Sequence, residues 1–109
     1  MQPPPATNDR MQKLQAMLER SPTDTFLLYA IAMEHKKAGN NAEALGFLDR
    51  VIRQDAGYCV AYHQAGLVHE AAGDVAAAKQ AYHDGIAAAT RKGDLHAAEE
   101  MKAALMMLD

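Results

Sequence analysis

Apolar and polar residues follow a helical period along almost the whole chain. The first clear example is a set of four positions spaced i, i+3, i+4, i+7, which share one face of a helix: Leu28, Ile31, Ala32 and His35. Good helix formers dominate the sequence, and no proline occurs after residue 22. The pattern predicts six helices, over residues 9–20, 23–38, 41–54, 58–72, 75–91 and 94–108. Because the links between them are short, neighbouring helices are expected to pack antiparallel.

Glycine followed by asparagine or aspartate marks the breaks between several of these helices. Glycine can adopt the left-handed conformation that ends a helix, so Gly39 and Gly73 are expected to be C-terminal caps. The residue after the glycine can accept hydrogen bonds from the first turn of the next helix. Asn40, Asp74 and Asp94 are therefore predicted to be N-terminal caps.

The two glycine breaks at positions 39 and 73 belong to an internal repeat of 34 residues. A shift by 34 pairs Leu28 with Tyr62, Ile31 with Ala65, Ala32 with Gly66, His35 with His69, Ala44 with Ala78, and Leu48 with Tyr82. Small residues recur where two helices must approach closely, and larger ones recur beside them. By the same pattern, His35 and His69 are expected to be largely buried on the packed face.

This spacing resembles the tetratricopeptide repeat (TPR), a helix–turn–helix unit of 34 residues, in a small protein of bacterial type. The resemblance implies an all-α fold, a short right-handed α-solenoid of about six antiparallel helices. It divides the chain into a half repeat at 9–22, full repeats at 25–58 and 59–92, and a capping helix at 94–108. These form a single domain over 9–109, preceded by a disordered tail over 1–8.

The two outer segments follow the same register. The half repeat is expected to turn Leu14, Met17 and Leu18 inward. The capping helix is expected to bury apolar residues at positions 95, 98, 101, 105 and 108. The second full repeat has Thr90 where the family's terminal proline would stand, so its last helix is predicted to continue for about one more turn, to Gly93.

Composition excludes several classes of function. The chain has 109 residues, 23% of them charged, and a net charge of −3, which argues against a nucleic-acid-binding or membrane-attached protein. The single cysteine, Cys59, cannot form an intramolecular disulfide. The first ten residues lack the pattern of a signal peptide, and the longest apolar run, residues 26–33, is too short to span a bilayer. We therefore expect a cytoplasmic protein.

The same run, FLLYAIAM, is the main functional signal. A helix that buries one stripe needs about three apolar residues in seven, so Phe26, Tyr29 and Met33 are surplus to the core. The family's ligand surface is the concave face, made by the first helix of each repeat. The resemblance places ten residues there as a protein-binding site: Phe26, Tyr29, Met33, Lys36, Lys37, Val60, His63, Gln64, Leu67 and Glu70.

Three functions remain open at this stage. The leading one is an interaction adaptor or scaffold that binds a partner helix or extended peptide in the groove, with charged residues at the rim setting its orientation. The second is a structural module that homodimerises through its apolar surface. The surplus residues would leave no open groove if such a second copy, or residues 9–20 of the same chain, covered them. The third is a metal- or thiol-dependent enzyme using Cys59 and His63, four residues apart. Because no HExxH or paired-cysteine motif occurs, no enzymatic activity, metal or cofactor is expected.

Overall fold

The computed structural model describes residues 8–109 and contains six α-helices in that range. Their bounds are α1 Asp9–Arg20, α2 Thr25–Lys37, α3 Asn41–Gln54, α4 Cys59–Ala71, α5 Val75–Lys92 and α6 Leu95–Met106. The predicted number of helices is confirmed, and each boundary lies within two residues of its expected place. The expected disordered tail over 1–8 lies outside the described residues except for Asn8, whose side chain caps α1.

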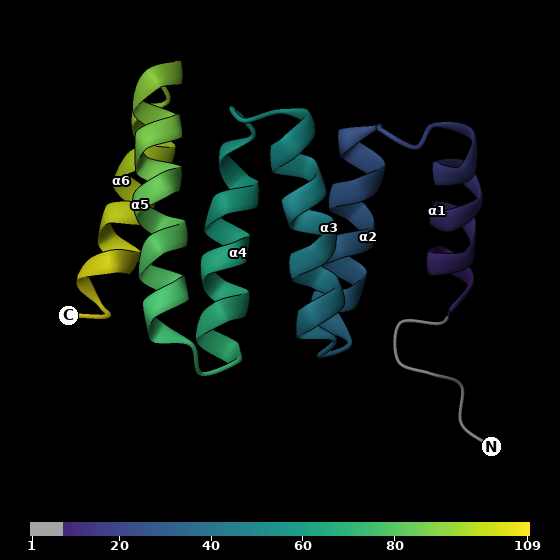
Figure 1. Cartoon of the computed structure of the whole chain (residues 1–109), viewed down its shortest axis with the longest axis horizontal. Helices are drawn as coiled ribbons and strands as arrows, with labels where there is room; N and C mark the ends of the chain where they lie inside the picture. The colour runs from purple at the N-terminus through teal and green to yellow at the C-terminus, as the bar shows by residue number, and fades with distance from the viewer. Residues whose placement is uncertain (1–7) are drawn as a thin grey trace.

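The helices follow one another along the long axis of the molecule (Figure 1), which measures 42 × 29 × 18 Å. Each helix packs against the next one in the chain, and α4 also contacts α6. No strand occurs within residues 8–109. The all-α solenoid predicted from the sequence is therefore confirmed.

Glycine ends three of the helices in the same way. Gly39, Gly73 and Gly93 all have φ of +80°, the left-handed region that favours glycine. After the first of them, the Asn40 N–H donates to the His35 carbonyl at 2.8 Å, as in a Schellman motif. The spacing of these glycines thus fixes where each helix stops.

Two of the three predicted N-terminal caps are confirmed. The Asp74 and Asp94 carboxylates each accept a backbone N–H three residues later, at 3.1 Å. The prediction for Asn40 is wrong, because its side chain makes no cap hydrogen bond to α3. Its amide nitrogen lies 3.4 Å from His35 Nδ1 instead, so the side chain is turned back towards α2.

Close approach of the helices depends on small residues. Ala32, Ala44 and Ala78 are fully buried, as the repeat predicted. A Cβ atom at Gly66 would lie 2.2 Å from Tyr82 Cε1, so the Tyr82 ring rests directly on the α4 backbone. A Cβ at Gly85 would similarly meet Met101 Sδ of α6 at 2.3 Å. Glycine at these two positions therefore sets the distances from α5 to α4 and α6.

His35 and His69 are only partly buried, and no polar or charged residue is fully buried within residues 8–109. His35 belongs to the last turn of α2, where its ring stacks on Phe47 with the ring centroids 5.6 Å apart. Full burial of an imidazole without partners would be unfavourable, and the end of the helix gives it access to water.

Two expected core positions in the outer helices are also wrong. Met17 is 52% exposed, and Leu95, the first residue of α6, is 71% exposed. The buried stripe of α1 runs through Met11 and Leu14 to the partly buried Leu18, the i, i+3, i+7 spacing of one helix face. Met17 lies beside this stripe and is therefore exposed. In α6, Ala98 and Met101 are buried as expected.

The predicted extension of α5 is confirmed, since this helix has 18 residues and ends at Lys92. As a result α6 begins 36 residues after α4, whereas α4 begins 34 residues after α2. The final helix is therefore out of register with the repeat.

The contact between Gly66 and Tyr82 leads to a stability prediction. Gly66→Ala should lower the free energy of unfolding by about 1–3 kcal/mol, because the new methyl group must displace a buried aromatic ring. Gly46→Ala is the matched control. Its Cβ would meet no atom within 4 Å on an exposed face of α3, so the change should raise stability by about 0.5–1 kcal/mol. Urea denaturation monitored by circular dichroism measures both, and equal effects would contradict the packing.

Candidate functional site

Exposed and half-buried side chains of α2, α4 and α6 form one continuous surface, which we call the groove face. Two observations connect its helices. Lys36 Nζ of α2 donates to Gln64 Oε1 of α4 at 2.6 Å. Residues of α4 and α6 together line a pocket. The surface thus includes the helices to which the ten sequence-predicted residues belong, and it extends beyond them to α6.

On the α2 and α4 part of this surface, two large apolar residues are open to solvent. Phe26 is 67% exposed and Val60 is 42% exposed. They occupy equivalent positions, one turn or less from the start of α2 and α4 respectively. Neither residue belongs to a core cluster among the described residues.

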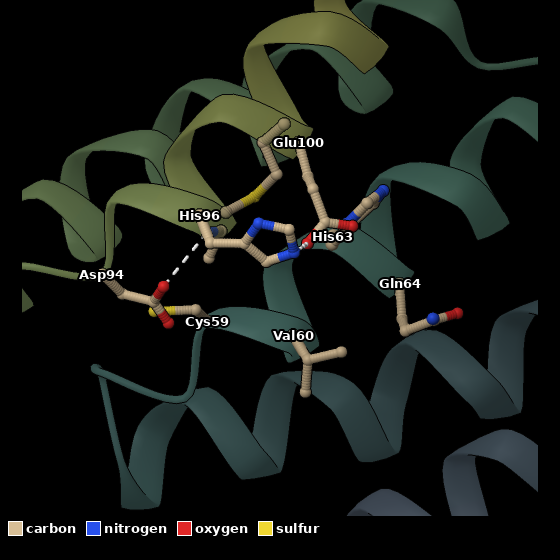
Figure 2. Close-up of a pocket in the computed structure, with 9 residues that line it drawn as sticks. Cys59, Val60, His63, Gln64, Asp94, His96 and Glu100 are labelled. Atoms are coloured by element: carbon tan, nitrogen blue, oxygen red, sulfur yellow. Dashed lines mark hydrogen bonds and ion pairs between the residues drawn. The ribbon is translucent and has the colours of Figure 1, made fainter.

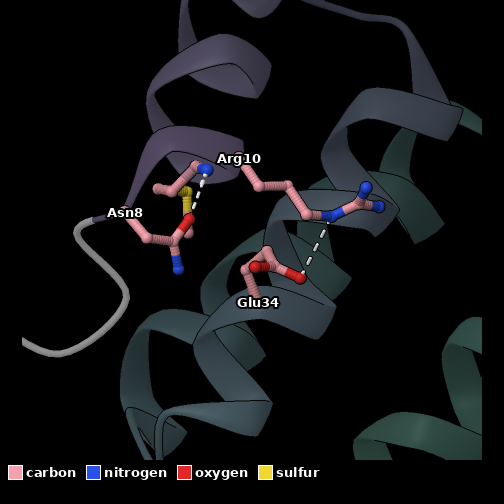
Figure 3. A network of polar contacts seen from close by, with 4 residues as sticks. Asn8, Arg10 and Glu34 are labelled. Carbon is pink, nitrogen blue, oxygen red and sulfur yellow. Dashed lines mark hydrogen bonds and ion pairs between the residues drawn. The ribbon is translucent and has the colours of Figure 1, made fainter.

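The first helix does not cover this surface. Met11 and Leu14 of α1 pack against Leu27, Ala30 and Ile31 of α2, so α1 uses a different side of α2. An ion pair supports the same placement (Figure 3), since Arg10 Nε lies 3.3 Å from Glu34 Oε2. Phe26 is consequently left exposed by residues 9–20.

Tyr29 and Met33 are partly incorporated into the core. Both are half-buried and pack against the core shared by α2, α3 and α4. The Tyr29 ring centroid lies 5.6 Å from that of Tyr58, in the loop before α4. Burial, and to a lesser degree the neighbouring Tyr58, raises the pKa of the Tyr29 phenol. These two residues therefore form the wall between the groove face and the interior.

The polar residues predicted at the rim have different environments. Lys37 is exposed, whereas Lys36 is held by Gln64. Glu70 is connected to α5, because its Oε2 accepts a hydrogen bond from the Tyr82 hydroxyl. Burial and this hydrogen bond raise the pKa of Tyr82 well above its usual range.

His63 lies beside the same tyrosine. Its ring meets the Tyr82 ring edge-on, with the centroids 5.9 Å apart. Leu67, one turn further along α4, is half-buried. Tyr82 therefore contacts the interior side of α4 at three residues: Gly66, His63 and Glu70.

A pocket of 340 Å³ opens between α4 and α6 (Figure 2). Its lining residues are Cys59, Val60, His63, Gln64, Asp94, His96, Ala97, Glu100 and Met101. Inside it, His96 Nε2 and Glu100 Oε1 are 2.9 Å apart. The Cys59 thiol is buried and donates to the Gly57 carbonyl at 3.3 Å. No group of three or more His, Cys, Asp or Glu side chains suited to a metal ion occurs within residues 8–109.

Sequence reasoning missed the contribution of α6 to this pocket: Asp94, His96, Ala97 and Glu100. The 34-residue repeat that assigned the other residues does not reach them, because the longer α5 shifts α6 out of register. The available signal was Thr90, where the missing proline predicted the extension. The direction in which α6 would then leave α5 could not be read from it.

Comparison with known proteins identifies relatives of similar size. A TPR repeat-containing protein of Pseudomonas aeruginosa is 32% identical over 99 residues, which cover 91% of this chain and 94% of that protein. No protein-family model matches the sequence. Among the described helices, none is long and apolar enough to cross a membrane.

Two solved structures share the fold. The NMR structure of a tetratricopeptide repeat domain protein from Salinibacter ruber has a TM-score of 0.75 and 28% identity, covering 81% of this chain and 89% of its own. The solution structure of a protein from Bordetella parapertussis has a TM-score of 0.79 and 28% identity, covering 99% of this chain and 89% of its own.

The buried Tyr82 phenol predicts a loss of stability at alkaline pH. Because folding raises its pKa, the unfolded chain loses this proton first. The stabilisation is complete below the unfolded pKa of about 10 and declines as the pH rises from there towards the folded pKa. Between about pH 10 and 11 the free energy of unfolding of the wild type should fall by about 1 kcal/mol more than that of Tyr82→Phe. Urea denaturation at stepped pH tests this, since the other groups titrate in both proteins. Parallel pH profiles would contradict the assignment.

Proposed function

The chain belongs to the tetratricopeptide-repeat family, whose fold generally mediates protein–protein interaction, and from this premise we propose that it is an adaptor whose groove face binds a helix or extended segment of a partner protein. The observation that carries the proposal is the exposure of Phe26 and Val60 on α2 and α4, two helices connected by the hydrogen bond from Lys36 to Gln64. Large apolar side chains gathered on one surface are typical of interaction sites.

The surroundings of these residues suit a protein ligand. Tyr29 and Met33 provide half-buried aromatic and thioether surface beside Phe26. Aromatic residues and methionine are enriched in the cores of interfaces, and methionine adapts its shape to different partners. Lys37 at the far end of α2 is free to contact a polar part of the ligand at the rim. TPR proteins are generally non-enzymatic scaffolds, in keeping with this role. A cytoplasmic location remains a prediction.

The second candidate function is homodimerisation as a structural module. The feature that favours it is the exposed end of α6, where Met106 and Met107 lie on the surface away from the core. Sedimentation velocity over about a hundredfold range of protein concentration separates the two functions. An adaptor should stay monomeric with an open groove face. A stable dimer that is broken by Met106→Ala/Met107→Ala would support the structural module, and one that is broken by Phe26→Ala would assign the groove face to a second copy.

The adaptor proposal predicts that exposed apolar residues matter for binding rather than for folding. Phe26→Ala/Val60→Ala should change the free energy of unfolding by about 1 kcal/mol or less in total, because both side chains already contact water. Binding should weaken by about 2 kcal/mol or more, as for central anchors of an interface. The measurement compares partners captured from the source cells by immobilised wild-type and variant protein, quantified by mass spectrometry.

The matched control is Met17→Ala/Val75→Ala, which removes two apolar residues of similar exposure from α1 and α5. This control variant should capture the same partner proteins as the wild type. The proposal fails if the control and the groove-face variant lose the same partners, or if neither loses any.

A further inference from the structure

The pocket between α4 and α6 is negatively charged and has an apolar floor. Asp94 and Glu100 supply two carboxylates, and no lysine or arginine belongs to the lining. Val60 and Ala97 provide apolar surface in the same lining. A pocket of this kind complements a side chain with an aliphatic stem and a positively charged end.

The charge distribution of the whole chain reinforces this local field. Residues 59–109 contain four basic and seven acidic residues, which account for the entire net charge of −3. The preceding residues carry seven of each sign. On the groove face, the lysines are Lys36 and Lys37 of α2; Lys36 reaches Gln64 of the pocket lining, and Lys37 is exposed at the end of α2. The face is therefore basic at α2 and acidic at α6, and a charged ligand would be oriented along it.

Three features of the pocket oppose a cation. The first is the Lys36 ammonium group, which lies 2.6 Å from Oε1 of the lining residue Gln64. The N-termini of α4 and α6 begin at the pocket, and each contributes a partial charge of about +0.5. For α6, the Asp94 carboxylate offsets this charge by capping Ala97 N–H. The pair between His96 and Glu100 is exposed and joins residues four apart on one helix, and exposed contacts of this kind contribute little to stability. A partner's cation can therefore replace His96 beside Glu100.

We propose that this pocket binds an arginine or lysine side chain of the partner segment, while an apolar residue next to it in the segment packs on Phe26 and Val60. The aliphatic stem lies along Val60 and Ala97, and the charged end meets Glu100. The lysines of α2 disfavour the opposite orientation of the segment, in which its basic residue would lie beside α2. This inference rests on the proposed function, because it specifies the ligand of the same groove face.

Selection from a phage-displayed library of random ten-residue peptides tests the inference. Wild-type protein should enrich peptides that share one basic residue beside an apolar one. Glu100→Lys should abolish the preference for the basic residue. The matched control, Glu99→Lys, changes the adjacent residue, which pairs with Lys102 outside the pocket and should leave the preference intact. For the best selected peptide, replacing its basic residue with glutamine should weaken binding to wild type about tenfold and binding to Glu100→Lys by less than twofold.

The outcomes separate the pocket from the groove face. Enriched peptides without a basic residue, or equal effects of Glu99→Lys and Glu100→Lys, would overturn the pocket assignment while leaving the adaptor proposal in place. If Phe26→Ala/Val60→Ala enriches the same peptides as wild type, the groove face itself is wrong and the inference falls with it. If wild-type protein enriches no peptide, the groove face and the pocket are likewise both wrong as binding sites. Thermal unfolding of each variant by circular dichroism confirms that the compared proteins are folded.

Discussion

The contact between the Tyr82 ring and the α4 backbone at Gly66 is the constraint on which the rest of the structure depends. A glycine permits this approach because it has no Cβ, and a tyrosine fills the space that two helices would otherwise leave between them. The Tyr82 ring thereby sets the distance between α5 and α4. Since α6 packs on α5 through Gly85 and Met101, the position of the last helix follows from the same contact.

Tyr82 also connects this core to the groove face. Its hydroxyl holds Glu70, and its ring edge supports His63, so two side chains of α4 are positioned from the interior. The surface in front of them is then free to carry residues that the fold does not need. Phe26 and Val60 are such residues, since they are exposed and lie outside the core clusters. A rigid helical scaffold with apolar side chains on its surface suits a role in binding, where order before contact reduces the entropic cost.

Charge adds direction to this surface. The lysines of the groove face belong to α2, whereas the pocket carboxylates Asp94 and Glu100 belong to the segment that forms α6 and its N-terminal cap. Apolar contacts alone allow a ligand to bind in either direction, whereas unlike charges on different helices favour one of them. The pocket owes its position to the extra turn of α5, which moves α6 out of the repeat register.

The sequence by itself determined the helices, their breaks and the small-to-large pairing of the core. These depend on local physics: helical periodicity, the left-handed conformation of glycine at Gly39 and Gly73, and the 34-residue recurrence of Ala44 and Ala78. The family resemblance then indicated which helices would share the candidate binding surface. Such features need only residues that are close in sequence or related by the repeat.

The tertiary structure decided which side of each outer helix is buried and how far each polar group is exposed. In α1, Met11 is buried and Met17 is exposed, because a terminal helix offers several apolar stripes and only the neighbouring helix selects one of them. His35 stays half-buried because the end of α2 is open to water. The α6 side of the pocket likewise depends on the direction in which the chain leaves α5. That direction results from packing between residues far apart in the sequence, which no local pattern records.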